Sequence, residues 1–240
     1  KQYPIYCRKK SSLDNEEEIL IDANEMSKGY NYFRVGMIEI SPDNKTMAYS
    51  IDTVSRRIYT IHFMDLETRK ISDKNIPNSS GSITWANDNK TIFYVKKDEQ
   101  TLRSHKIFKH VLGTDSSDDE LVFEEKDETY SCYVYKSKSN KYLFIGSYQT
   151  LATEIRFLDA NKPNGDWTII QPRERGHEYS VSHYDDSFFI RTNWNAKNYK
   201  LMKTAVSTPS KESWKELIAH RDDVFLSGIE IFKKFLVLQE

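Results

Sequence analysis

The feature that most constrains this chain is a short hairpin pattern that returns along its length. Met37–Ile40 reads as an incoming strand, Ser41–Asn44 as a tight turn, and Thr46–Ser50 as the outgoing strand. The segment Trp85–Tyr94 is a near copy, and weaker copies follow. A hairpin that recurs at near-constant spacing predicts a repeat protein.

The spacing of equivalent positions defines the repeat. The turn positions are Asn44, Asn89, Asn140, Asp186 and Lys233, and the third-strand positions are Ile5, Ile58, Ile107, Ile155 and Leu201. The turns lie 45, 51, 46 and 47 residues apart, and the third strands lie 53, 49, 48 and 46 residues apart. A period of about 40–50 residues with four strands per unit is typical of a β-propeller blade. A β-sandwich, the alternative, need not keep this register.

The register predicts an all-β chain of four-stranded antiparallel blades, with a single short helical turn near Asp22–Glu25. The predicted units are a half-blade at 1–30, blades at about 31–80, 81–128, 129–176 and 177–222, and a half-blade at 223–240. A propeller closes its circle to avoid exposed edges. Either the two half-blades pair as a fifth blade, or the chain is an excerpt from a longer propeller.

Composition narrows the range of partners. The chain has 35 Lys and Arg against 36 Asp and Glu, so its net charge of −1 gives no electrostatic reason to expect nucleic acid or an anionic membrane. No run approaches the roughly 20 apolar residues of a membrane span, and the first residues lack the layout of a signal peptide. The two cysteines, Cys7 and Cys132, are predicted to be buried free thiols rather than a disulfide.

No catalytic motif is present. A hydrolase nucleophile needs a G-x-S-x-G elbow, and none of the eight glycines supplies it or a phosphate-cradling loop. The histidine pairs His105/His110 and His177/His183 are five and six residues apart, which does not favour paired metal ligands on one strand face. We therefore predict no catalytic residue, metal or cofactor within this chain.

Short strings distributed along the chain carry a family resemblance. They are Tyr3–Tyr6, Ser55–Tyr59, Trp85–Asp88, Gly113–Thr114, Glu124–Tyr130 and Gly176–Ser180. They resemble the N-terminal propeller of the prolyl oligopeptidase family of serine peptidases, and the resemblance runs from end to end. It implies that the chain is part of a seven-bladed propeller over an α/β-hydrolase domain, which carries a Ser-Asp-His triad and is absent here.

The resemblance also implies a function. Such enzymes are cytoplasmic and cut short peptides, here after Arg or Lys, and the non-catalytic propeller excludes large folded proteins. The missing catalytic domain and peptide substrates are then the expected partners. Arg56 and Arg57, between second and third strands, are either an exposed strand start or contacts to that domain, because a guanidinium pairs well with carboxylates. Glu124 and Glu125 are read either as a solvated charge run or as further contacts.

Two other functions remain open at this stage. A stand-alone five-bladed interaction scaffold would close by pairing 3–21 with 225–238, although the strands lack the Gly-His and Trp-Asp signatures of WD40 repeats. A glycan-active propeller would need clustered carboxylates and sialidase repeats, which are absent. Unpaired blade edges also predict an edge-strand dimer of the isolated chain.

Overall fold

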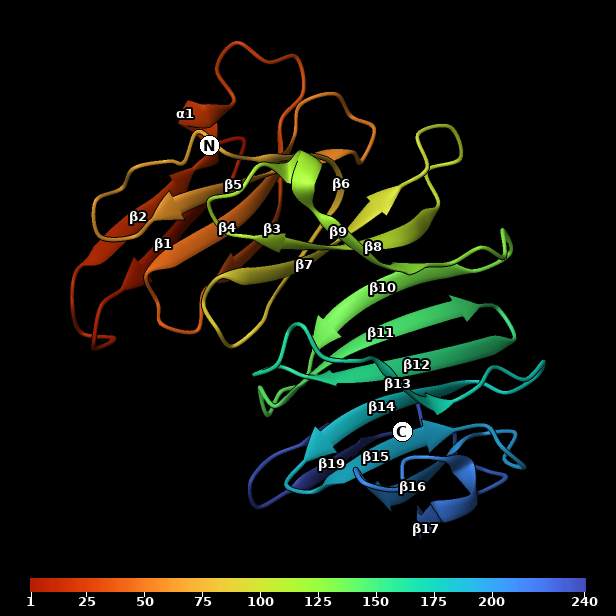
Figure 1. Ribbon diagram of the computed structural model, residues 1–240. Helices are drawn as coiled ribbons and strands as arrows, with labels where there is room; N and C mark the ends of the chain where they lie inside the picture. Colours follow the sequence, from red (N-terminus) through yellow and green to blue (C-terminus); the bar gives the residue numbers. More distant parts are fainter.

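The structure is a computed structural model that describes residues 1–240, and it consists of antiparallel sheets that follow one another along an arc (Figure 1). The first two-stranded sheet contains β1 (Ile5–Lys9) and β2 (Glu17–Asp22), and it is followed by the helical turn α1 (Ala23–Met26). Asp22 caps α1 by accepting a hydrogen bond from the backbone N–H of Asn24. The predicted helical turn is therefore confirmed.

The largest sheet has seven strands in sequence order, β3 to β9. Its strands are β3 (Arg34–Ile40), β4 (Thr46–Asp52), β5 (Tyr59–Asp65), β6 (Ile76–Trp85), β7 (Thr91–Lys97), β8 (Ser104–Val111) and β9 (Glu120–Glu124). The sheet contains two repeats because β6 serves both. Its first residues pair with β5, its last residues pair with β7, and the register shifts between Ser79 and Ile83.

The remaining sheets repeat the same strand order. β10 (Ser131–Lys136), β11 (Tyr142–Gln149), β12 (Ala152–Asp159) and β13 (Thr168–Gln171) form one blade. β14 (Tyr179–Tyr184), β15 (Ser187–Thr192), β16 (Lys200–Ala205) and β17 (Lys215–Ile218) form the next, and β18 (Gly228–Ile231) pairs with β19 (Leu236–Gln239). The predicted all-β architecture of four-stranded antiparallel blades is confirmed.

The repeated hairpin turns have a common backbone conformation. Asn44, Asn89, Asn140 and Asp185 lie in the left-handed region, with φ of 60°, 61°, 59° and 57°. Asn and Asp tolerate this region because their short side chains bond to the local backbone. The recurring Asn in the sequence therefore marks the residue that reverses the chain between the first and second strands.

Consecutive hairpin turns are also tied to one another. The Asp43 amide donates to Asn89 Oδ1 at 2.8 Å, and Asn87 Nδ2 donates to the Asn140 carbonyl at 2.9 Å. In the later repeats the Tyr184 hydroxyl donates to the carbonyl of Lys233 at 3.2 Å. We call the side of the arc that carries these turns the hairpin face. The opposite strand ends carry the second-to-third-strand loops and the links between blades, and form the loop face.

Apolar side chains pack between neighbouring blades rather than in a single centre. Central strands are buried on both sides, as in β7, where Thr91 to Val95 are all buried. Phe93 packs towards the β10–β13 blade, whereas Ile92 and Tyr94 join the cluster with Phe63 of β5. Each blade therefore depends on its neighbours for a core, as expected of a repeat architecture.

The two ends differ from two sequence expectations. β1–β2 and β18–β19 form separate two-stranded sheets, so the pairing required by a closed five-bladed scaffold does not occur. Cys132 is buried as predicted, but the prediction for Cys7 was wrong because its side chain is exposed on the first half-blade. No helix in the structure has the length and apolarity needed to cross a membrane.

Candidate interdomain surface

The Arg56–Arg57 pair lies on a tight loop between β4 and β5, on the loop face. The buried carboxylate of Asp52 organises this loop by accepting hydrogen bonds from the amides of Val54, Ser55 and Arg57, at 2.8, 3.0 and 2.7 Å. Ser55 and Arg57 adopt left-handed φ values of 65° and 55°. The sequence folds locally in this way because one aspartate satisfies three loop amides.

The two arginine side chains are exposed. The backbone below them is fixed, because Lys97 Nζ donates to the Arg57 carbonyl at 2.8 Å. Neither guanidinium forms an ion pair within the chain, so both are free to contact a carboxylate outside it. A rigid loop that presents two unpaired guanidinium groups is suited to interdomain recognition.

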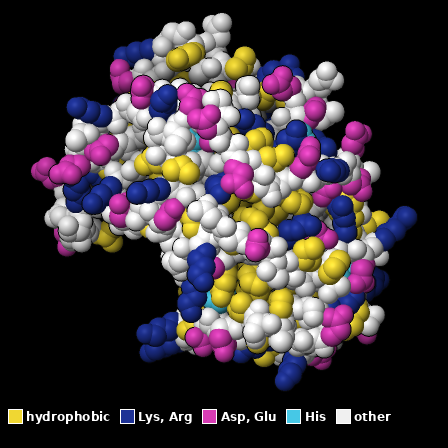
Figure 2. Space-filling model, viewed as in Figure 1, with side chains coloured by type: hydrophobic (Ala, Val, Ile, Leu, Met, Phe, Trp, Pro, Cys, Tyr) yellow, Lys and Arg dark blue, Asp and Glu magenta, His cyan; other side chains and the backbone are white.

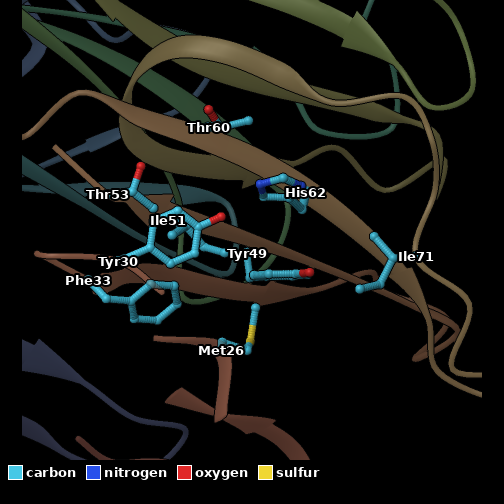
Figure 3. A pocket seen from close by; sticks show the side chains of 9 residues that line it. All are labelled: Met26, Tyr30, Phe33, Tyr49, Ile51, Thr53, Thr60, His62 and Ile71. Atoms are coloured by element: carbon cyan, nitrogen blue, oxygen red, sulfur yellow. The ribbon is translucent and has the colours of Figure 1, made fainter. Parts of the chain in front are cut away.

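A largely apolar pocket of about 530 Å³ opens beside this loop (Figure 3). Its lining residues come from α1 and the segment after it, from β4 and β5, and from the loops that follow these strands: Met26, Tyr30, Phe33, Tyr49, Ile51, Thr53, Thr60, His62 and Ile71. The rings of Tyr49 and His62 stack with centroids 5.5 Å apart. Burial lowers the pKa of His62, so the imidazole is neutral at pH 7.

The acidic pair Glu124–Glu125 is divided by the fold. Glu124 is exposed at the end of β9, where its carboxylate lies 3.5 Å from Lys106 Nζ. Glu125 is only 3% exposed. Its carboxylate accepts hydrogen bonds from the Ser147 hydroxyl and from the Asp127 amide, the latter at 2.9 Å. Glu124 is therefore available at the surface, whereas the carboxylate of Glu125 is engaged inside the chain.

Arg173 completes the environment of Glu125. Its Nη1 lies 2.9 Å from Glu125 Oε2, and its guanidinium lies 4.2 Å from the ring centroid of Tyr130. From the other side, Arg103 Nη1 donates to the carbonyls of Glu125, Asp127 and Tyr130 at 3.2, 3.2 and 2.8 Å. Arg103, which lies just before β8, thus holds the link between β9 and β10 to the preceding blade, and Arg173, which follows β13, holds it to the following blade.

Sequence reasoning did not identify Arg103 or Arg173. Arg173 lies 48 residues beyond Glu125, so the pair is visible only once the two blades are stacked. The one available signal was the repeat itself. Glu125 is the first residue after the fourth strand of its blade, and Arg173 is the second residue after the fourth strand of the next blade. The structure does not bring Arg56 or Arg57 to Glu124 or Glu125: the arginines lie on the β4–β5 loop, and the glutamates lie at the link between β9 and β10.

The residues described above do not form a metal site or an activated thiol. No group of three His, Cys, Asp or Glu side chains is placed to hold a metal ion. Burial, and then the nearby Glu125, raise the pKa of the Cys132 thiol to about 12, so this thiol is not a nucleophile at neutral pH. The contacts that this surface offers are charged and apolar.

Comparison with known proteins gives a consistent assignment. The family model described as "Prolyl oligopeptidase, N-terminal beta-propeller domain" matches residues 1–240. Dipeptidyl aminopeptidase BI from Pseudoxanthomonas mexicana is 37% identical, with all of this chain and 35% of the relative aligned. Protease 2 from Moraxella lacunata is 31% identical, with 99% of this chain and 35% of the relative aligned.

Solved structures agree with the sequence relatives. Oligopeptidase B from Leishmania major superposes with a TM-score of 0.91 at 32% identity, covering 98% of this chain and 34% of that protein. Oligopeptidase B from Trypanosoma brucei, solved with covalently bound antipain, gives a TM-score of 0.87 at 28% identity, covering 98% of this chain and 34% of that protein. The chain thus spans about a third of its relatives' length, and it belongs to the N-terminal β-propeller domain of the prolyl oligopeptidase family.

Proposed function

We propose that this chain is the non-catalytic propeller of a cytoplasmic serine peptidase of the oligopeptidase B (protease II) type, which cleaves short peptides after Arg or Lys. The observation that carries the proposal is the match of all 240 residues to the family's propeller, together with a span of about a third of each relative. The remaining blades and an α/β-hydrolase domain with the Ser-Asp-His triad complete the proposed enzyme.

In this proposal the propeller acts by steric selection. A curved wall of stacked blades admits an extended peptide to a covered catalytic site and excludes a folded protein, whose cross-section is larger. The interblade cores support this role because they hold each blade against the next without a ligand. Bond cleavage belongs to the other domain.

A cleavage assay tests the proposal. The full-length protein is expected to hydrolyse a benzyloxycarbonyl-Arg-Arg arylamide and to spare both the matching Pro substrate and a folded protein such as ubiquitin. Residues 1–240 alone are expected to hydrolyse nothing. Cleavage by the isolated chain, or full-length activity on Pro and not on Arg, would contradict the proposal.

The 37% identity to a dipeptidyl aminopeptidase favours a second candidate activity, release of dipeptides from a free N-terminus. The two activities differ in their need for an α-amino group. An arylamide of a dipeptide is tested with its N-terminus free and with the same N-terminus blocked. Activity restricted to the free form would assign the protein to the second candidate.

We further propose that Arg56, Arg57 and Glu124 contact the catalytic domain, with Glu125 acting indirectly by holding the same face together. Exposure and the lack of an ion pair within the chain support both arginines, and Arg57 is tested first because its backbone is also fixed by Lys97. Arg57→Ala in the full-length enzyme is expected to lower kcat/KM several-fold, and Arg57→Lys, which keeps the charge, is expected to restore part of it. Unchanged kcat/KM and unchanged domain closure by small-angle scattering in Arg57→Ala would refute this role.

A further inference from the structure

A second hollow, of about 430 Å³, lies on the hairpin face between the turns of three consecutive repeats. Its walls come from the β10–β11, β14–β15 and β18–β19 turns. The residues that decide its chemistry are Lys138, Lys141, His183, Asp185, Phe232 and Lys233. The hollow is remote in the chain from the Arg56–Arg57 loop and lies on the opposite face of the blades.

The lysines of this hollow differ in how their charge is compensated. Lys138 Nζ lies 2.6 Å from Glu230 Oε2 and 3.7 Å from the ring centroid of Phe232, so it is already paired. Lys141 Nζ reaches only a backbone oxygen, the Asp185 carbonyl, at 3.3 Å. The ammonium of Lys233 forms no ion pair. Two of the three ammonium groups are therefore without a carboxylate partner, and Asp185 is the one carboxylate among the lining residues.

His183 adds a further donor to this group. Its side chain is buried, and its Nε2 has no hydrogen-bond partner. Its Nδ1 lies 2.7 Å from Ser139 Oγ, which lies 2.9 Å from Ser137 Oγ, and the Tyr142 amide donates to Ser137 Oγ. If the hydroxyls donate towards Nδ1, both hydroxyls have an acceptor, whereas the reverse order leaves the Ser137 hydroxyl without one. In the first arrangement the imidazole proton is on Nε2, where it has no acceptor within the protein.

The earlier repeats provide an internal comparison. Lys45 and Lys90 follow the left-handed Asn44 and Asn89 just as Lys141 follows Asn140. Asparagine side chains tie those earlier turns directly to the next repeat. In the later repeats the turns are joined by longer side chains, from Lys141 and Tyr184, and the hollow remains between them.

We propose that this hollow binds the carboxylate groups of an acidic peptide segment. The ammonium groups of Lys141 and Lys233 have no carboxylate partner and His183 Nε2 has no hydrogen-bond partner, so anionic acceptors suit this hollow. Phe232, Ile231 and Tyr184 provide an apolar wall for the peptide's side chains. The volume and the apolar wall favour a peptide over an isolated phosphate ion. Basic side chains gather along the concave edge of the later blades in Figure 2, where such a segment has open access.

The test uses the full-length protein and a fluorescein-labelled tri-glutamate peptide, with fluorescence anisotropy as the readout. The double variant Lys141→Gln/Lys233→Gln is expected to weaken binding about tenfold, since each lost ion pair contributes about threefold at a partly exposed site. The matched control is Lys45→Gln/Lys90→Gln, which removes the equivalent turn charges of the earlier blades and is expected to leave binding unchanged. A tri-glutamine peptide is expected not to bind.

Three outcomes would overturn the proposal. They are equal weakening by both double variants, equal binding of the tri-glutamine peptide, and displacement of the tri-glutamate peptide by equimolar inorganic phosphate. The last would assign the hollow to phosphate instead. Because the readout is binding, it is independent of which peptide bond the enzyme cleaves, so failure here and failure of the proposed activity are separately visible.

Discussion

Consecutive blades of this chain are joined in two different ways. Between the first two full blades a single strand, β6, runs through both, and the joint is a close-packed bulge. Between the later blades the links are loops at 125–130 and 172–178, and the joint is held by charges and hydrogen bonds. The first joint is held by close packing around an uncharged core, whereas the second depends on charged side chains.

The β6 joint is built around one aromatic ring. Tyr59 is 6% exposed, and a Cβ atom at Gly81 would lie 2.8 Å from its ring, as would one at Gly36. The Ser50 hydroxyl donates to the Gly81 carbonyl at 3.0 Å, and Ser79 Oγ donates to the Tyr59 carbonyl at 3.0 Å. Steric fit and short-range hydrogen bonds therefore replace a loop at this position.

The largest expected effect is at the β6 joint. Gly81→Ala introduces both a left-handed φ penalty, at φ 90°, and a clash with Tyr59. We expect a loss of about 3 kcal/mol in the free energy of unfolding, measured by urea denaturation. Gly113→Ala is the matched control because Gly113 has φ 93° and nothing within 4 Å of a Cβ, so it is expected to lose only about 1 kcal/mol. Equal losses would show that the joint is not close-packed.

The next effect is at the loop joint. Glu125→Gln removes the charge that pairs with Arg173 while preserving the shape of the side chain. We expect the free energy of unfolding to fall by about 2 kcal/mol. This is less than is usual when a buried ion pair is broken, because the Arg173 side chain is partly exposed and water can solvate its unpaired charge. The neighbouring Glu124→Gln, at an exposed ion pair, is expected to change the free energy of unfolding by less than about 0.5 kcal/mol. Similar losses in both variants would argue against a structural role for Glu125.

A pH effect should appear at the second loop joint. His177 is buried, its Nε2 lies 2.9 Å from Thr192 Oγ1, and burial, followed by Lys211, lowers its pKa. A lowered pKa means that the unfolded chain takes up the proton first, so stability falls as pH drops below about 6.5. His177→Gln keeps a hydrogen-bonding group without the titration and is expected to reduce the slope of the stability profile between pH 7 and 5. An unchanged slope in this variant would exclude His177 as the source.

The smallest expected effect is a change in the rate at which Cys132, next to the first loop joint, is alkylated. Iodoacetamide at pH 8 is expected to alkylate the exposed Cys7 and to leave Cys132, whose pKa is raised to about 12, unmodified in the native protein. Cys132 lies on β10 directly after the first loop joint. Mass spectrometry should show faster Cys132 alkylation in Glu125→Gln than in Gly113→Ala, if the charged joint controls local opening. Prompt labelling of Cys132 in the unaltered chain would contradict its burial.

The sequence by itself determined the repeat. The left-handed Asn44, Asn89 and Asn140 and the alternation of the flanking strands follow from local backbone chemistry, which a single sequence records. Strand order, blade number and the helical turn after Asp22 were therefore predictable. The short motifs that resemble the prolyl oligopeptidase propeller extended the propeller prediction to the whole chain.

Tertiary structure decided which side chains are available. Alternation places Glu124 and Glu125 on opposite faces of a strand, but it does not say which face another blade covers. That choice depends on Ser147 and Arg173, which reach Glu125 only when the blades stack. Likewise the sequence predicts separate blades at about 31–80 and 81–128, while only the pairing of β6 with both β5 and β7 and the packing of Gly81 on Tyr59 show that one strand runs through both. Local chemistry sets the repeat, and contacts between distant repeats set its surface.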